Sequence, residues 1–136
     1  MAMIRDQVGP RLRELGLKGG GRNWEYPSDS HWVLLGFQGS QYNSSKTGRY
    51  TINLTVCSRH TWSEACAQRS YLPSKPKANV GYGTFCWRRR IGQLMPEPQD
   101  KWWEISADGS SHEVASEMLD AIEHLGLPSC LEQLRA

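Results

Sequence analysis

Two kinds of hydrophobic spacing divide this chain into helical ends and a strand-like middle. Near the N-terminus, apolar residues recur with the period of an α-helix: Met3, Ile4, Val8, Leu12 and Leu15. Pro10 lacks an N–H group, so we expect this helix to be kinked there or to begin near Gly9. Gly16 is well placed to end it in a left-handed cap. The following Lys18-Gly-Gly-Gly-Arg22 is expected to be a flexible turn.

The C-terminal part has the same period, which predicts a second helix. It would begin at the capping box formed by Ser110 and Glu113, in which side chains and backbone N–H groups satisfy each other. Its apolar stripe is Val114, Met118, Ala121, Ile122 and Leu125. Gly126 is expected to close this helix, and a short last helix is expected to begin at Ser129.

Between these ends, apolar and polar residues alternate, which predicts β-strands. The expected strands are 23–26, 31–38, 49–57, 84–91 and 101–106, with 31–38 and 49–57 paired as an antiparallel hairpin. Segment 58–80 is ambiguous, with one or two helical turns over 61–70 and a loop over 72–77. The predicted fold is α+β: a single curved antiparallel sheet of about five strands, with N- and C-terminal helices packed on one face and residues 1–136 forming a single domain.

Strand alternation also predicts which side chains share a face of the sheet. We expect the helix-facing set to be Phe37, Leu54, Phe85, Trp87, Trp103 and Ile105. The opposite face would display Trp32, Leu34, Gln38, Thr51, Asn53, Thr55, Arg88, Arg90, Trp102 and Glu104. Rings, amides and guanidinium groups together are typical of recognition surfaces. The candidate binding residues are therefore Trp32, Gln38, Asn53, Arg88, Arg90, Trp102 and Glu104.

Two structural interpretations of this face stay open. Arg88 and Arg90 could pair across strands with Glu104 and stack on Trp102, which would only stabilise the sheet. Alternatively, residues 58–80 could fold over the face and bury it. Arg89 points toward the helices by the same alternation. It could lie past the covered part of the strand, or form an ion pair with the acidic C-terminal helix.

Charge is unevenly distributed along the chain. Residues 1–90 carry 14 basic and 5 acidic side chains, and residues 91–136 carry 2 basic and 9 acidic ones. The first part could present a surface to a polyanion. We favour the other interpretation, in which the acidic C-terminal helix packs beside the basic strands and neutralises them.

Recognisable catalytic motifs do not occur in the sequence. There is no Gly-x-Ser-x-Gly elbow, and Lys18-Gly-Gly-Gly-Arg22 follows a helix, whereas phosphate loops open one. The four cysteines show no Cys-x-x-Cys spacing, so we expect reduced thiols in a cytosolic protein, and the zinc alternative with Cys57, His60 and Cys66 lacks the second half of a site. We expect no catalytic residue, metal or cofactor, and neither a signal peptide nor a membrane span.

Five motifs in order resemble a known family. They are Leu15-Gly-Leu-Lys18 with Trp24, Phe37-Gln38-x-Ser40-x-x-Asn43, Tyr50-Thr-Ile-Asn-Leu54, Trp87-Arg-x-Arg-Ile-Gly-x-Leu94 and Asp100-Lys-Trp-Trp-Glu-Ile105. Together, over about residues 4–125, they resemble the bacterial domain-of-unknown-function family number 4304. The resemblance implies a small, standalone cytosolic bacterial protein. It implies no reaction, cofactor or catalytic residue.

Three functions follow as hypotheses. The first is a non-enzymatic binding protein that receives a macromolecular partner, above all another protein, on an open sheet face. The second is binding of single-stranded RNA, with bases stacked on Trp32 and Trp102. The third is an enzyme that holds a small anionic ligand with Arg88, Arg90, Gln38 and Asn53, for which no general base can be named. The oligomeric state is left open.

Overall fold

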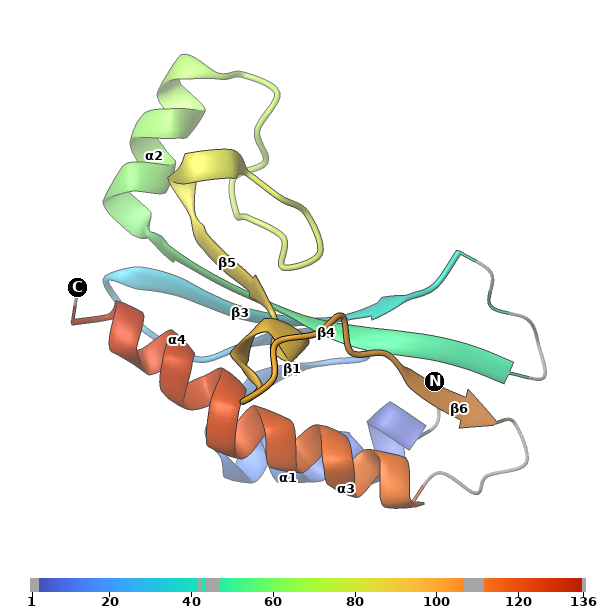
Figure 1. The fold of residues 1–136 in the computed structure, drawn as a ribbon. Helices are drawn as coiled ribbons and strands as arrows, with labels where there is room; N and C mark the ends of the chain where they lie inside the picture. The colour runs from blue at the N-terminus through green and yellow to red at the C-terminus, as the bar shows by residue number, and fades with distance from the viewer. Residues whose placement is uncertain (1–2, 42, 44–46, 107–111, 136) are drawn as a thin grey trace.

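The computed structural model describes residues 3–41, 43, 47–106 and 112–135, and confirms the predicted α+β class. An antiparallel sheet carries the N- and C-terminal helices on one face, while α2 lies on the other side (Figure 1). The helices are η1 (Ile4–Val8), α1 (Gly9–Glu14), α2 (Arg59–Gln68), η2 (Gly83–Phe85), η3 (Ile91–Leu94), α3 (His112–Ala121), η4 (Ile122–Gly126) and α4 (Leu127–Gln133). The strands are β1 (Lys18–Gly20), β2 (Asn23–Glu25), β3 (His31–Gly39), β4 (Thr47–Ser58), β5 (Trp87–Arg90) and β6 (Trp103–Ser106).

The long strand β4 organises the sheet. Strands β1 to β5 follow one another in the order of the chain, and the predicted β3–β4 hairpin is confirmed. On its other edge β4 pairs with two strands in succession, because β6 lies opposite Thr47–Tyr50 and β5 opposite Asn53–Val56. The sheet therefore has six strands, and β5 and β6 lie end to end along one edge of β4.

The main hydrophobic core lies between the sheet and the terminal helices. It joins side chains of β3 and β4 to those of η1, α1, α3 and η4, including Phe37, Ile52, Leu54, Ile4, Leu12, Met118 and Ile122. Trp103 is buried in this core, and Trp87 and Ile105 pack against it, as alternation predicts. Phe85 was expected on the same face but packs in a second cluster with Cys57 and Trp62. The reason is that the 3-10 turn Gly83–Phe85 interrupts the alternation before β5 begins.

The prediction that Gly126 ends a helix is wrong. Gly126 has α-helical dihedral angles, and the chain continues through it into α4. The N–H of Leu127 donates to the carbonyl of Ile122, and this π-turn accommodates Pro128, which has no N–H to donate. The same device precedes Pro10, where the N–H of Gly9 donates to the carbonyl of Ile4. The proposed capping Ser110 lies outside the described residues.

Gly126 instead allows close packing of the C-terminal helix on the sheet. A Cβ atom at this position would lie 2.8 Å from Cδ1 of Ile91 and 3.3 Å from Cδ1 of Leu54. By contrast, Gly16 has a φ of 98° and is the left-handed cap that the sequence predicts. The two glycines thus have different roles that the same sequence pattern, Leu-Gly-Leu, does not distinguish.

The Gly-rich segment after the first helix is a strand over Lys18–Gly20, and only Gly21 and Arg22 form the predicted turn. Lys18–Gly20 pairs with Asn23–Glu25. Gly19 has a φ of 140°, and a Cβ there would collide with the carbonyl oxygen of Asn23 at 2.3 Å. Only glycine permits this approach, although glycine is otherwise depleted in strands, and the prediction failed for that reason.

Candidate binding surface

The face of the sheet opposite α1, α3 and α4, called here the far face, carries the candidate residues. Alternation along β4 places Thr51, Asn53, Thr55 and Cys57 on it, and the register of β5 places Arg88 opposite Thr55 and Arg90 opposite Asn53. Glu104 of β6 lies opposite Arg49. The structure thus brings these side chains to one face, in two groups: a polar cluster around Arg90, and a cation–aromatic cluster around Trp32.

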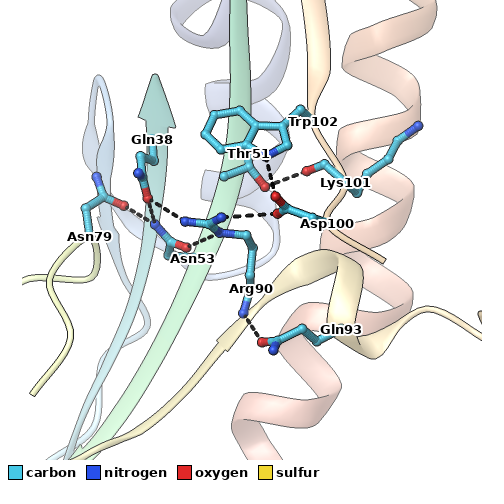
Figure 2. Close-up of polar contacts among 9 residues, drawn as sticks. All are labelled: Gln38, Thr51, Asn53, Asn79, Arg90, Gln93, Asp100, Lys101 and Trp102. Atoms are coloured by element: carbon cyan, nitrogen blue, oxygen red, sulfur yellow. Dashed lines mark hydrogen bonds and ion pairs between the residues drawn. The ribbon is translucent and has the colours of Figure 1, made fainter. Parts of the chain in front are cut away.

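The guanidinium group of Arg90 is the centre of the polar cluster (Figure 2). Its Nε donates to Oδ1 of Asn53 at 3.3 Å, and its Nη2 donates to Oε1 of Gln38 at 3.2 Å. Its Nη1 pairs with Oδ1 of Asp100 at 3.1 Å. The ring of Trp102 lies 5.3 Å from the guanidinium carbon. Each of the three guanidinium nitrogen atoms of Arg90 therefore has a partner within the chain.

Asn53 connects this cluster to the segment that follows α2. Its side chain is fully buried, and Nδ2 donates to Oε1 of Gln38 at 2.6 Å and to Oδ1 of Asn79 at 2.9 Å. Asn79 in turn donates to the backbone carbonyl of Phe37. These bonds fasten residues 76–79, called here the covering segment, onto the middle of the far face.

The expectation of an open sheet face is therefore wrong for its central part. Leu34 is buried beside the covering segment, which also accepts a hydrogen bond from Thr55 at the carbonyl of Ala78. Thr51 is fully buried and donates to the carbonyl of Lys101 at 2.6 Å. The alternative in which residues 58–80 fold over the sheet is thus confirmed for the centre of the face. The physical reason is that these short polar side chains satisfy backbone groups of the covering loops.

Asp100 provides the carboxylate that pairs with Arg90, a role that the structural interpretation gave to Glu104. It accepts the indole N–H of Trp102 at 3.0 Å as well as the guanidinium. The hydrogen bond from Trp102, followed by the one from Arg90, holds the pKa of Asp100 below its ordinary value. Glu104 is exposed and lies at the β6 end of the face, because β6 pairs with a different part of β4 than β5 does.

Arg88 has a buried donor that the described part of the chain does not satisfy. Its Nε is buried and has no hydrogen-bond partner among the described residues. Burial, and then the positive charge of Arg90, lower the pKa of Arg88. Arg89, which alternation points toward the helices, is exposed and lies over the ring of Trp87 at 5.3 Å. Its expected ion pair with the C-terminal helix does not occur in the described part of the chain.

Trp32 forms the second group with cations from two separate segments. The guanidinium carbon of Arg59 lies 3.7 Å from the ring centroid, and the ammonium of Lys75 lies 5.2 Å from it. Glu25 of β2 forms ion pairs with both cations. The half-buried indole is thus the centre of a local structural cluster, and cations already occupy its surroundings.

Beside this cluster, a groove of about 600 Å³ lies between the β1–β2 hairpin and the covering segment. Three lysines line it, Lys18, Lys75 and Lys77, while Glu25 is its acidic residue. Lys75 pairs with Glu25, whereas Lys18 and Lys77 have no carboxylate partner in the described ranges. Trp24, Leu34, Pro76 and Ala78 give the groove an apolar part. No pattern in the sequence indicates this groove, because its walls come from the unpredicted glycine strand and the ambiguous segment.

The acidic C-terminal helix and the cations of the far face lie on opposite sides of the sheet, although Arg5, Arg11 and Arg13 of η1 and α1 share the helix side. The C-terminal helix, residues 112–133, contains five carboxylates and no Lys or Arg, and it packs on the face opposite the cations. Its ion pair with another described element is the one between Glu123 and Arg11 of α1, at 2.7 Å. The expected neutralisation of the basic strands by this helix is therefore wrong: the sheet lies between them.

The thiol and imidazole groups do not assemble into a metal site within the described ranges. Cys57 is buried and donates to the carbonyl of Phe85, whereas His60 is exposed and faces Glu64. All four cysteines are free. No helix among the described residues is long and apolar enough to span a membrane.

Comparison with known proteins assigns the chain to a family. The model of the family described as "Domain of unknown function (DUF4304)" matches residues 8–132. The chain belongs to this family. The match includes every element from α1 to β6 and most of the C-terminal helix, so the far face and the groove lie within the family domain. No curated protein and no solved structure matches the chain.

Proposed function

We propose that this DUF4304 protein is a non-enzymatic binding protein that docks an acidic partner protein on its basic far face. The observation that supports this most is the separation of charge across the sheet. The cations of the far face are Lys18, Arg49, Arg59, Lys75, Lys77, Arg88 and Arg90, against the carboxylates of Glu25, Asp100 and Glu104. Because a sheet separates the acidic helix from these cations, their potential is left for an external anion to satisfy.

The groove is the most favourable place for such contacts. Lys18 and Lys77 are exposed there and have no ion-pair partner among the described residues, and they lie beside apolar side chains. A partner with carboxylates flanking an aliphatic or aromatic side chain would match both features, since interfaces combine an apolar centre with a polar rim. Arg88, across the covering segment, is half-buried and adds a further positive charge to the same surface.

A protein partner fits this face better than single-stranded RNA does. Base stacking needs accessible ring faces, and the candidate rings already have cations over them. Trp32 lies against Arg59 and Lys75, and Trp102 lies against Arg90. These intramolecular contacts would have to be broken before a base could replace the cation.

Catalysis on a small anion is less well supported for a similar reason. Arg90, Gln38 and Asn53, which that hypothesis needs as ligands, bond to one another and to Asp100 and Asn79. Their donors and acceptors are used to hold the covering segment in place. We therefore assign this cluster a supporting role, and the exposed cations around it the role of contacts.

The proposal is tested by capture of partners with two matched variants. Lys18→Glu with Lys77→Glu reverses two exposed, unpaired charges of the groove. Arg5→Glu with Arg135→Glu makes the same charge change at exposed positions outside the far face. We expect wild type and the second variant to capture an acidic protein, resistant to nuclease, that the first variant loses while its thermal midpoint stays unchanged.

Two outcomes of this experiment oppose the proposal. Capture that nuclease abolishes would favour the RNA hypothesis. Equal capture by both variants would place the interface elsewhere. The expected bacterial origin and cytosolic location also stay proposals, and the free cysteines support the latter, since cytosolic thiols are kept reduced.

A further inference from the structure

Two cysteines that the docking surface does not use lie in the second hydrophobic cluster, between α2 and the far face. Cys57 is near the end of β4, and Cys86 directly precedes β5. Both are free and buried. They share this cluster with Trp62, and with the partly buried side chains of Trp32, Cys66, Leu72, Tyr82 and Phe85.

The register of the two strands places the two thiols opposite each other. Val56 lies opposite Trp87, so the next pair of positions is Cys57 and Cys86. The N–H of Arg59 donates to the carbonyl of Ser30, which precedes β3. Backbone groups two positions apart in a strand point to the same side, so the N–H and C=O of Cys57 also point toward β3 and away from β5. Cys57 and Cys86 therefore occupy a non-hydrogen-bonded position, where facing Cα atoms are closest, at about 4.5 Å, and side chains on one face are adjacent.

The two side chains are in direct contact. The thiol of Cys86 is hydrogen-bonded to the sulfur of Cys57, which lowers the pKa of Cys57 and raises that of Cys86. The thiol of Cys57 also lies 3.0 Å from the carbonyl of Phe85. Cys57 is thus the sulfur of this neighbouring pair that has the lower pKa.

We propose that Cys57 and Cys86 are a modification site that closes to a disulfide by thiol–disulfide exchange with a low-molecular-weight disulfide such as oxidised glutathione. Local opening of the second cluster first exposes the buried Cys57 sulfur. Its thiolate then attacks one sulfur of the reagent, the reagent's S–S bond breaks, and one glutathione thiolate leaves. Cys86 loses its proton to solvent and attacks the Cys57 sulfur of the mixed disulfide. The second glutathione leaves, so the two cysteines are oxidised and one disulfide is reduced to two thiols that take up two protons.

The disulfide would join the two ends of the segment 57–86. Residues 57–86 contain α2 and the covering segment. Closing this loop of about 30 residues restricts the unfolded chain, so the oxidised protein should melt about 10 °C higher than the reduced one. It would also fix the start of β5, two residues before Arg88.

The experiment treats the folded full-length chain with oxidised glutathione and maps the products after tryptic digestion. Trypsin places the four cysteines in separate peptides, 50–59, 60–69, 78–88 and 102–135. We expect a crosslink between peptides 50–59 and 78–88, loss of two of the 4 thiols, and reversal by reductant. Cys66→Ser should leave this product unchanged, whereas Cys57→Ser should abolish it.

Several results would overturn the assignment. They are a crosslink that includes Cys66 or Cys130, glutathione retained on Cys57 with Cys86 still free, or a 57–86 crosslink that forms only in denaturant. A thermal midpoint of the oxidised protein no higher than that of the reduced one would contradict the predicted restriction of the loop. Because Cys57→Ser can affect folding, the wild-type crosslink and the Cys66→Ser control decide the assignment without it.

Discussion

Replacing Asn53 by alanine should weaken the fold strongly, because this one amide fastens the covering segment to the sheet. The side chain is fully buried and makes three hydrogen bonds, to Gln38, Asn79 and the cationic Arg90. A neutral hydrogen bond contributes about 1 kcal/mol and one to a charged group about 1.5–3 kcal/mol. We therefore expect the free energy of unfolding to fall by about 4 kcal/mol.

Urea unfolding followed by tryptophan fluorescence measures this loss. With a slope of about 2 kcal/mol per molar, the midpoint should fall by roughly 2 M while the slope stays constant. Asn23→Ala is the matched control, since Asn23 is an exposed strand residue and its replacement should cost within about 0.5 kcal/mol. Equal midpoints for the two variants would refute the supporting role assigned to the polar cluster.

Three further predictions concern other parts of the molecule. Gly126→Ala should lower the thermal midpoint despite the better helix propensity of alanine, because the alanine Cβ would collide with the fully buried Ile91. A higher midpoint would contradict the role of Gly126 in close helix–sheet packing. The pKa of Asp100 is lowered in the folded state, so the ionised carboxylate stabilises the fold above about pH 4, and this contribution is lost as the pH falls further. In Asp100→Asn, the thermal midpoint should therefore fall less steeply with acid than in wild type. Identical pH dependence of the two midpoints would contradict this prediction. Burial raises the pKa of Cys130 to about 12, so iodoacetamide at pH 9 should label Cys66 well before Cys130. Peptide mapping measures the two labelling rates, and equal rates would be inconsistent with the burial of Cys130.

The strands of the sheet, and the face on which each side chain lies, could be predicted from the sequence because alternation is a local property. The period of two over 31–38 and 49–57 specifies both strands of the central hairpin. It also places Asn53 and Arg90 on one face, since period two holds wherever a strand is regular. Where regularity ends, as at the 3-10 turn before β5, the prediction for Phe85 failed.

Long-range packing could not be predicted from single residues. Nothing in residues 76–79 indicates that they cover the sheet, because Asn79 becomes a partner of Asn53 only in the folded chain. The choice of Asp100 over Glu104 for Arg90 depends in the same way on β5 and β6 lying end to end. The single-domain prediction for residues 1–136 stays a prediction.

The most direct test of the basic docking face is a fluorescence-anisotropy titration at low and at physiological salt. Its probes are a labelled peptide of glutamate and leucine residues and an oligouridylate of equal charge. We predict that the peptide binds more tightly than the oligouridylate, and that Lys18→Glu with Lys77→Glu weakens peptide binding at least tenfold whereas Arg5→Glu with Arg135→Glu leaves it unchanged. Tighter binding of the oligouridylate, or equal peptide binding by the two charge-reversed variants, would contradict the account.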